Sequence, residues 1–138
     1  MKDRRIEVCL SPELLHLYEV KTKIVVVADI LRATSCMVTA FAHGVQSIQP
    51  FSDLESCRQA SALGYETSGE RNGVKVEGFD RGNSPFEYTG ADIRGKRIAF
   101  TTTNGTQAID KSRHSAHLLI GAFLNIDSLA NKIMNLNE

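Results

Sequence analysis

Hydrophobic residues recur along this chain with the period of a strand in some segments and of a helix in others. Ile6, Val8 and Leu10 alternate with other residues, which predicts a half-buried strand near the N-terminus. Residues 24–28 form a continuous apolar run rich in β-branched side chains, typical of a strand buried on both faces of a parallel sheet. Between them, Ser11-Pro12 offers an N-cap and a first-turn proline for a helix over residues 13–19.

Helical and strand patterns then alternate to the end of the chain. Helical spacing of apolar residues predicts helices over residues 33–41, 53–63, 106–112 and 126–134, and short apolar runs predict strands over residues 45–51, 65–68, 96–101 and 118–120. Gly44 and Gly64 follow two of the helices as stop signals, and Ser52 and Glu55 have the spacing of a capping box. This alternation predicts one α/β domain over residues 1–138, a three-layer α/β/α arrangement with a mostly parallel sheet.

The composition of the chain limits which partners and which cellular location are expected. The 16 basic and 16 acidic residues cancel, so no overall basic field indicates a nucleic acid or a membrane surface as partner. Cys9, Cys36 and Cys57 are widely spaced and form no CxxC pair, which argues against a disulfide framework or a zinc site. Four of the first five residues are charged, and the longest apolar run is far too short to span a bilayer. These features together predict a cytoplasmic protein.

Polar and charged residues gather where the predicted strands end. Asp29 and Arg32 follow one strand, Glu70-Arg71 ends another, and residues 101–106 and 121–125 follow two more. Ligands of open parallel sheets bind beyond the carboxyl ends of the strands. We therefore expect these segments to meet at one edge of the sheet and to form a binding site there.

Two of these segments have chemistry suited to an anionic ligand and a metal. A carboxylate placed after a buried strand, as Asp29 is, costs desolvation unless Arg32 or a metal pairs with it. The alternative is that Asp29 caps the next helix, with Arg32 as a structural partner. Residues 101–106 (TTTNGT) bring hydroxyls and free amides to a helix start, which suits phosphate or sulfonate. The alternative there is a threonine-rich strand followed by an Asn-Gly turn.

The glycine-rich loop between residues 69 and 95 offers further candidates. Asp80 and Asn83 lie in a segment dense in turn formers, so they serve either a ligand or local backbone hydrogen bonds. Glu70 is either a second metal-binding carboxylate or a partner of Arg71. No GxxxxGK[ST] or GxGxxG motif is present, no cysteine has an arginine six positions on, and Asp29 lacks the second aspartate of a DxD phosphatase.

Five segments resemble sequence blocks of the 2-phosphosulfolactate phosphatase family, in the family's order and spacing: residues 26–35 (VVADILRATS), 69–71 (GER), 78–85 (GFDRGNSP), 101–106 (TTTNGT) and 121–125 (GAFLN). The resemblance implies a Mg²⁺-dependent phosphatase that hydrolyses 2-phosphosulfolactate to sulfolactate and phosphate, a step of coenzyme M biosynthesis. Family chains continue for roughly another hundred residues, about a further domain. This chain is therefore expected to be the N-terminal half of a longer phosphatase fold.

We assign roles to the block residues from their chemistry. Asp29, Glu70 and Asp80 are expected to hold Mg²⁺, and Asp29, Arg32 and Asn104 to take part in catalysis. The residues expected to bind the substrate, a small phosphorylated acid, are Arg71, Asn83, Thr102, Thr103, Asn104, Gly105 and Thr106.

Two other functions stay open at this point. One is a non-catalytic anion-binding domain, or an inactive fragment whose exposed apolar surface would favour homo-oligomers. The other is a different hydrolase or a sugar- or nucleotide-binding α/β domain.

Overall fold

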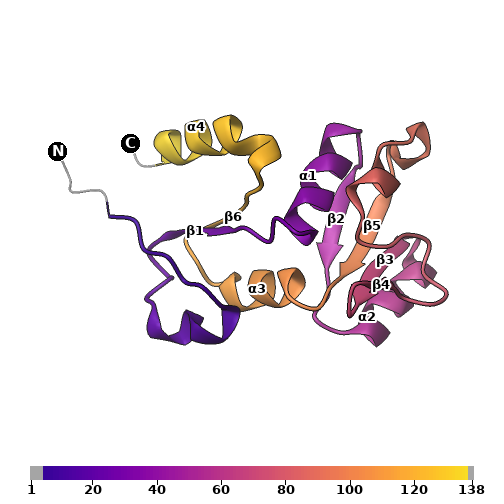
Figure 1. The fold of residues 1–138 in the computed structure, drawn as a ribbon, viewed down its shortest axis with the longest axis horizontal. Coiled ribbons are helices and arrows are strands. Elements are labelled where there is room, and N and C mark those ends of the chain that lie inside the picture. Colours follow the sequence, from indigo (N-terminus) through magenta and orange to yellow (C-terminus); the bar gives the residue numbers. More distant parts are fainter. Residues whose placement is uncertain (1–4, 137–138) are drawn as a thin grey trace.

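The computed structural model describes residues 5–136, and its strands form two sheets (Figure 1). The smaller sheet is a parallel pair of β1 (Ile24–Val27) and β6 (His117–Ile120). The larger sheet has the order β2-β5-β3-β4, with bounds β2 Ser47–Pro50, β5 Arg97–Thr101, β3 Glu66–Arg71 and β4 Val74–Lys75. Only β4 runs antiparallel to its neighbour. The predicted α/β class with mostly parallel strands is confirmed, but the strands are divided between two sheets.

Helices α1 (Ala33–Ala42) and α3 (Gly105–Ser112) lie between the two sheets (Figure 1). Helix α3 contacts β1 on one side and β2 and β5 on the other, and α1 packs against α3 and β6. Helix α2 (Leu54–Gln59), continued by a 3₁₀ helix over Ala60–Leu63, packs on β5 and β3, and α4 (Ile126–Leu136) follows β6. The two helices between the sheets therefore hold the smaller sheet in place beside the larger one.

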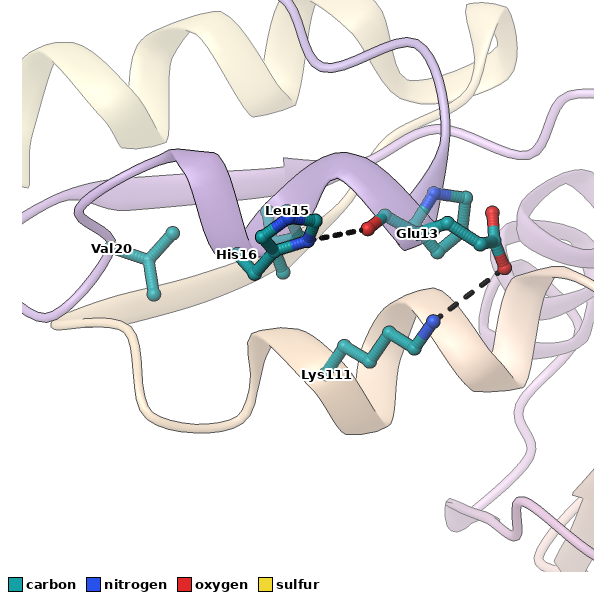
Figure 2. A pocket seen from close by; sticks show the side chains of 6 residues that line it. Glu13, Leu15, His16, Val20 and Lys111 are labelled. Atoms are coloured by element: carbon teal, nitrogen blue, oxygen red, sulfur yellow. Dashed lines mark hydrogen bonds and ion pairs between the residues drawn. The ribbon is translucent and has the colours of Figure 1, made fainter.

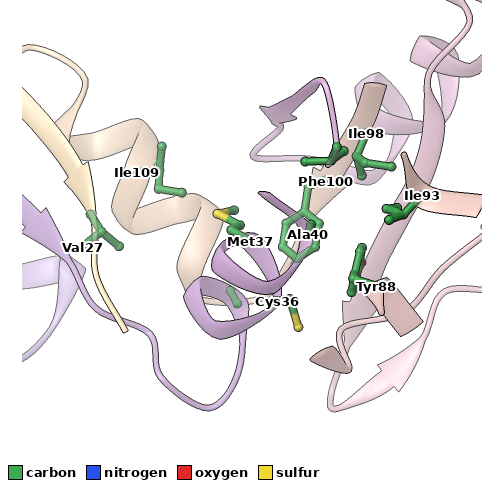
Figure 3. Packing of buried hydrophobic residues seen from close by; sticks show 11 residues of the cluster. Val27, Cys36, Met37, Ala40, Tyr88, Ile93, Ile98, Phe100 and Ile109 are labelled. Carbon is green, nitrogen blue, oxygen red and sulfur yellow. The ribbon is translucent and has the colours of Figure 1, made fainter. Parts of the chain in front are cut away.

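Strand β5 shows why the larger sheet is covered on both faces. Ile98 and Phe100 point into the main core cluster with α1, whereas Ala99, between them, packs in a second cluster with Cys57 of α2. Successive strand residues point to opposite faces, so this buried run serves two cores. Figure 3 shows the main cluster, in which Met37 of α1 lies between β1 and the larger sheet. Full burial of a side chain such as Phe100 contributes about 1.5–3 kcal/mol.

Helix ends follow local signals, with one difference from expectation. Asp53, and not Ser52, is the N-cap of α2: its Oδ1 accepts a hydrogen bond from Ser56 N at 2.7 Å. Gly44 ends α1 with φ +91°, a left-handed conformation that glycine adopts without a Cβ clash. The predicted helix over residues 53–63 is present as α2 and its 3₁₀ extension.

The N-terminal segment departs from the predicted strand. Residues 5–10 are irregular, and the side chains of Ile6 and Leu10 are 91% and 89% exposed. Alternation stabilises a strand only where a partner edge and an apolar face are available, and β1 pairs with β6 alone within residues 5–136. For the same reason β1 is not buried on both faces: Val27 lies in the core, but Val26 is 37% exposed.

The glycine-rich loop after β3 is ordered. It contains β4 and two 3₁₀ helices, Pro85–Tyr88 and Ala91–Ile93, whose Tyr88 and Ile93 side chains are fully buried. Arg81 forms ion pairs with Glu66 of β3 at 3.0 Å and with Asp92. None of the helices within residues 5–136 is long and apolar enough to cross a membrane.

Candidate functional site

A pocket of about 260 Å³ lies where β1, β3 and β5 end. Leu31, Asn72 and Gly73 form part of its wall, and none of these three was predicted as a site residue. Its other lining residues were all predicted from the sequence: Asp29, Arg32, Glu70, Asn83, Thr103 and Asn104. The chain segments at the ends of β1, β3 and β5 therefore meet at one place, as expected, whereas residues 121–125 after β6 do not line this pocket.

Asp29 lies at the N-termini of two helices. The backbone N–H groups of Ala33, the first residue of α1, and Gly105, the first residue of α3, favour the ionised form of its carboxylate. A Cβ built on Gly105 would lie 2.4 Å from Ala33 Cβ and 2.9 Å from Asp29 Oδ2, so the close approach of the helices requires glycine there. Free amides and helix dipoles make this region favourable for negative charge.

The ionised form of Asp29 is nevertheless disfavoured in the folded chain. Burial raises the pKa of Asp29, the negative charge of Glu70 raises it further, and the backbone N–H groups of Ala33 and Gly105 only partly oppose this. The repulsion between two carboxylates in one pocket falls when one of them is protonated or when a cation binds beside them. A cation beside Asp29 and Glu70 would relieve this repulsion.

Glu70, at the end of β3, is almost fully buried and is fixed by backbone donors. Its Oε1 accepts from Thr103 N and its Oε2 from Gly73 N, each at 2.7 Å. Burial alone would raise the pKa of Glu70, but these hydrogen bonds outweigh burial and hold the pKa below its usual value. Each carboxylate oxygen keeps a further lone pair, so an ionised Glu70 remains able to bind a cation.

The threonine-rich segment divides into residues that face the pocket and residues that shape the turn. Thr106 Oγ1 donates to Thr102 O at 2.9 Å and accepts from Thr102 N at 3.0 Å, and Thr102 Oγ1 accepts from Thr106 N at 3.2 Å. Both side chains are buried and their hydrogen bonds are internal. The structure therefore does not bring Thr102 and Thr106 into the pocket as substrate ligands, whereas Thr103 and Asn104 line it.

Arg71 is another predicted ligand that does not line the pocket. Its guanidinium donates to Glu70 O at 2.6 Å and to Thr101 Oγ1 at 2.9 Å, which joins β3 to β5. Arg32, in contrast, does line the pocket and makes a long hydrogen bond of 3.3 Å to Gly73 O. Arg32 is therefore the guanidinium placed to reach a bound anion.

The expected trio of metal-binding carboxylates is not assembled. Asp80 does not line the pocket; its Oδ2 accepts from Thr67 N at 2.7 Å and from Thr67 Oγ1 at 2.9 Å. Within residues 5–136, no three His, Cys, Asp or Glu side chains are grouped closely enough to hold a metal ion. Asp80 thus follows the local-turn alternative, because its carboxylate satisfies backbone and hydroxyl donors of β3.

A second hollow, of about 290 Å³, lies between the 3₁₀ helix Pro12–Leu17 and α3 (Figure 2). Its single carboxylate, Glu13, is paired with Lys111 at 3.5 Å, and His16 Nδ1 lies 2.7 Å from Glu13 O. Glu13 and Lys111 neutralise each other at the exposed surface, and no second carboxylate among the described residues lines this hollow. This hollow therefore lacks the convergent polar groups of a catalytic site.

Comparisons with known proteins identify the family of this chain. The family model described as 2-phosphosulpholactate phosphatase matches residues 9–138. Proteins named "Probable 2-phosphosulfolactate phosphatase" are similar to this chain: that of Clostridium beijerinckii is 38% identical and that of Clostridium novyi 40%, each over 97% of this chain. That of Caldanaerobacter subterraneus is 40% identical over 87% of it. The chain spans 58% of the length of the two clostridial relatives.

Proposed function

Because the chain belongs to the 2-phosphosulpholactate phosphatase family, we propose that it hydrolyses 2-phosphosulfolactate, or a similar small anionic phosphomonoester, to the alcohol and phosphate. The observation that carries this proposal is the pocket itself. It combines Asp29 and Glu70 with Arg32 and with the N-termini of α1 and α3. Carboxylates beside a guanidinium and two helix N-termini suit a phosphate accompanied by a cation.

The donor set fits Mg²⁺, which we propose as the cofactor. Mg²⁺ takes oxygen ligands and is commonly bound by one or two carboxylates together with substrate phosphate. Asp29 and Glu70 would hold it, and their mutual repulsion would be relieved. When bound, Mg²⁺ supplies charge neutralisation at the phosphoryl oxygens and lowers the pKa of a bound water.

The protein's own groups would bind and orient the reactants. Arg32 would bind the phosphoryl oxygens and stabilise the charge that develops on them. Asn104 is the N-cap of α3, yet its side chain makes no capping hydrogen bond, so its amide is available to orient the attacking water. The bond between phosphorus and the ester oxygen breaks as the bond to the water oxygen forms, and the released alkoxide takes a proton from solvent.

A phosphate-release assay with 2-phosphosulfolactate tests the proposal. Purified chain should release phosphate in the presence of Mg²⁺ and stop when EDTA is added. Calorimetry with the same compound, run in parallel, measures binding without turnover. Tight binding without release would favour a non-catalytic anion-binding domain, and the short span of this chain against its relatives gives that alternative specific support.

A further inference from the structure

Asn83 holds a buried oxygen that has no hydrogen-bond partner. Within residues 5–136, three buried side-chain atoms lack a partner: Thr34 Oγ1, Asn83 Oδ1 and Ser115 Oγ. Asn83 lines the pocket that contains Asp29 and Glu70, whereas Thr34 and Ser115 do not line it. The Asn83 residue is only 7% exposed, so solvent does not satisfy this oxygen in the way it satisfies surface amides. A buried carbonyl oxygen without a donor is unfavourable unless a ligand supplies the missing contact.

The backbone beside Asn83 is held rigidly by buried groups. Gly82 O accepts hydrogen bonds from Tyr88 Oη at 2.6 Å and Ser68 Oγ at 3.0 Å, and Gly82 N donates to Glu87 Oε2 at 2.7 Å. Arg81 adds two backbone hydrogen bonds to β3, from its N to Thr67 O and from Gly69 N to its O. The segment before Asn83 therefore behaves as an extension of the sheet beside Glu70, and the Asn83 side chain is positioned in advance.

We propose that Asn83 Oδ1 is a third oxygen ligand of the divalent cation that Asp29 and Glu70 bind. This inference rests on the cation of the proposed function and assigns a ligand that carboxylate spacing alone misses. The two carboxylates already balance a charge of +2, so the third ligand is best a neutral amide oxygen, which hard cations accept readily. Asn83 thus takes the position that the sequence had suggested for Asp80.

Titration with Mn²⁺, followed by electron paramagnetic resonance without any phosphorylated compound, tests this ligand directly. Asn83→Leu should weaken Mn²⁺ binding by about tenfold or more, whereas Asn83→Asp, which keeps an oxygen in place, should retain it. The matched control is Asn131→Leu on the exposed side of α4, which should bind Mn²⁺ as the unaltered chain does. Thermal unfolding with EDTA shows that each variant is folded.

The outcomes separate this inference from the proposed function. If the unaltered chain binds Mn²⁺ and Asn83→Leu binds it equally well, Asn83 is not a ligand, and the site at Asp29 and Glu70 stands. If Asn83→Asp loses binding as completely as Asn83→Leu, the amide NH₂ is the essential group and the ligand role is overturned. If the unaltered chain binds no Mn²⁺, the cation site itself fails, and phosphate release with and without EDTA still tests hydrolysis.

Discussion

Glu70 Oε1 accepts a hydrogen bond from Thr103 N at 2.7 Å, and this contact joins the end of β3 to the loop that follows β5. The same carboxylate raises the pKa of Asp29, which follows β1 in the other sheet. Glu70 therefore contacts the loop after β5 of the larger sheet and disfavours the ionised form of Asp29, which follows the smaller sheet.

Asp29→Asn should lower kcat for phosphate release by about 100-fold or more, because a cation-binding carboxylate becomes a neutral amide. The fold should survive, since the hydrogen bond from Thr34 N to the backbone oxygen of residue 29 does not depend on the side chain. Ionised Asp29 is disfavoured in the folded chain, so the free energy of unfolding in EDTA at neutral pH should not fall. Steady-state kinetics and urea unfolding measure the two effects, and near wild-type turnover would end this assignment of Asp29.

Asn104→Ala should lower kcat without weakening α3, because the Asn104 side chain makes no capping hydrogen bond. The matched control is Asp53→Ala, which removes the hydrogen bond from Ser56 N that caps α2. That change should cost about 1 kcal/mol of unfolding free energy. Urea unfolding and phosphate release of both variants check the contrast; a loss of stability in Asn104→Ala alone would contradict it.

Gly105→Ala should destabilise the chain by about 1–3 kcal/mol, because its new Cβ would lie 2.4 Å from Ala33 Cβ. Substituting Ala33 as well allows a double-mutant cycle. Ala33→Gly removes the atom that the new methyl group meets, so the double variant should lose less stability than the sum of the single variants. Additive losses by urea unfolding would show that contact between α1 and α3 is not the cause.

Asp80→Asn should reduce stability at neutral pH and leave Mn²⁺ binding unchanged. Burial would raise the pKa of Asp80, but hydrogen bonds from Thr67 outweigh it and lower the pKa from its ordinary value of 3.8. A lowered carboxyl pKa stabilises the fold above the unfolded value, and this contribution disappears as pH falls through the lower folded value. The variant should therefore lose about 1 kcal/mol at pH 7 and nothing at strongly acidic pH, as urea unfolding at both would show.

Thiol labelling should distinguish Cys9 from the other two cysteines. Burial raises the pKa of Cys36 to about 12 and that of Cys57 to about 11, and both are fully buried. Thiolates are the reactive form, so at pH 8 a disulfide reagent should label one thiol per folded chain quickly and three after unfolding. Cys9→Ser should abolish the fast phase; a fast phase that survives this change would mean that the α1 or α2 cysteine is accessible.

Much of the pocket was predictable because the positions of its residues depend on local order along the chain. Asp29 follows β1, Glu70 lies at the end of β3, and Thr103 and Asn104 follow β5; parallel strands bring such residues to one edge. The fold class followed from the same alternation. These predictions needed no knowledge of which strand pairs with which.

The predictions that failed depended on contacts that alternation does not specify. Ile6, Val8 and Leu10 carry a strand pattern, but no neighbouring strand pairs with them within the described residues. Thr102 and Asp80 have the side chains of ligands, yet the backbone N–H groups of Thr106 and Thr67 satisfy them first. The unpaired oxygen of Asn83 is visible only once its surroundings are known.

The division into two sheets has a consequence for motion. The β1–β6 pair contains only two strands, so its amides should exchange with deuterium faster than those of β5, which is buried on both faces. Asp29 follows β1 of the two-stranded sheet, and Glu70 lies in β3 of the larger sheet. A cation bound by both carboxylates would link the two sheets and slow deuterium exchange in Ile24–Val27. Binding in the pocket would therefore stabilise the whole β1–β6 sheet against local opening.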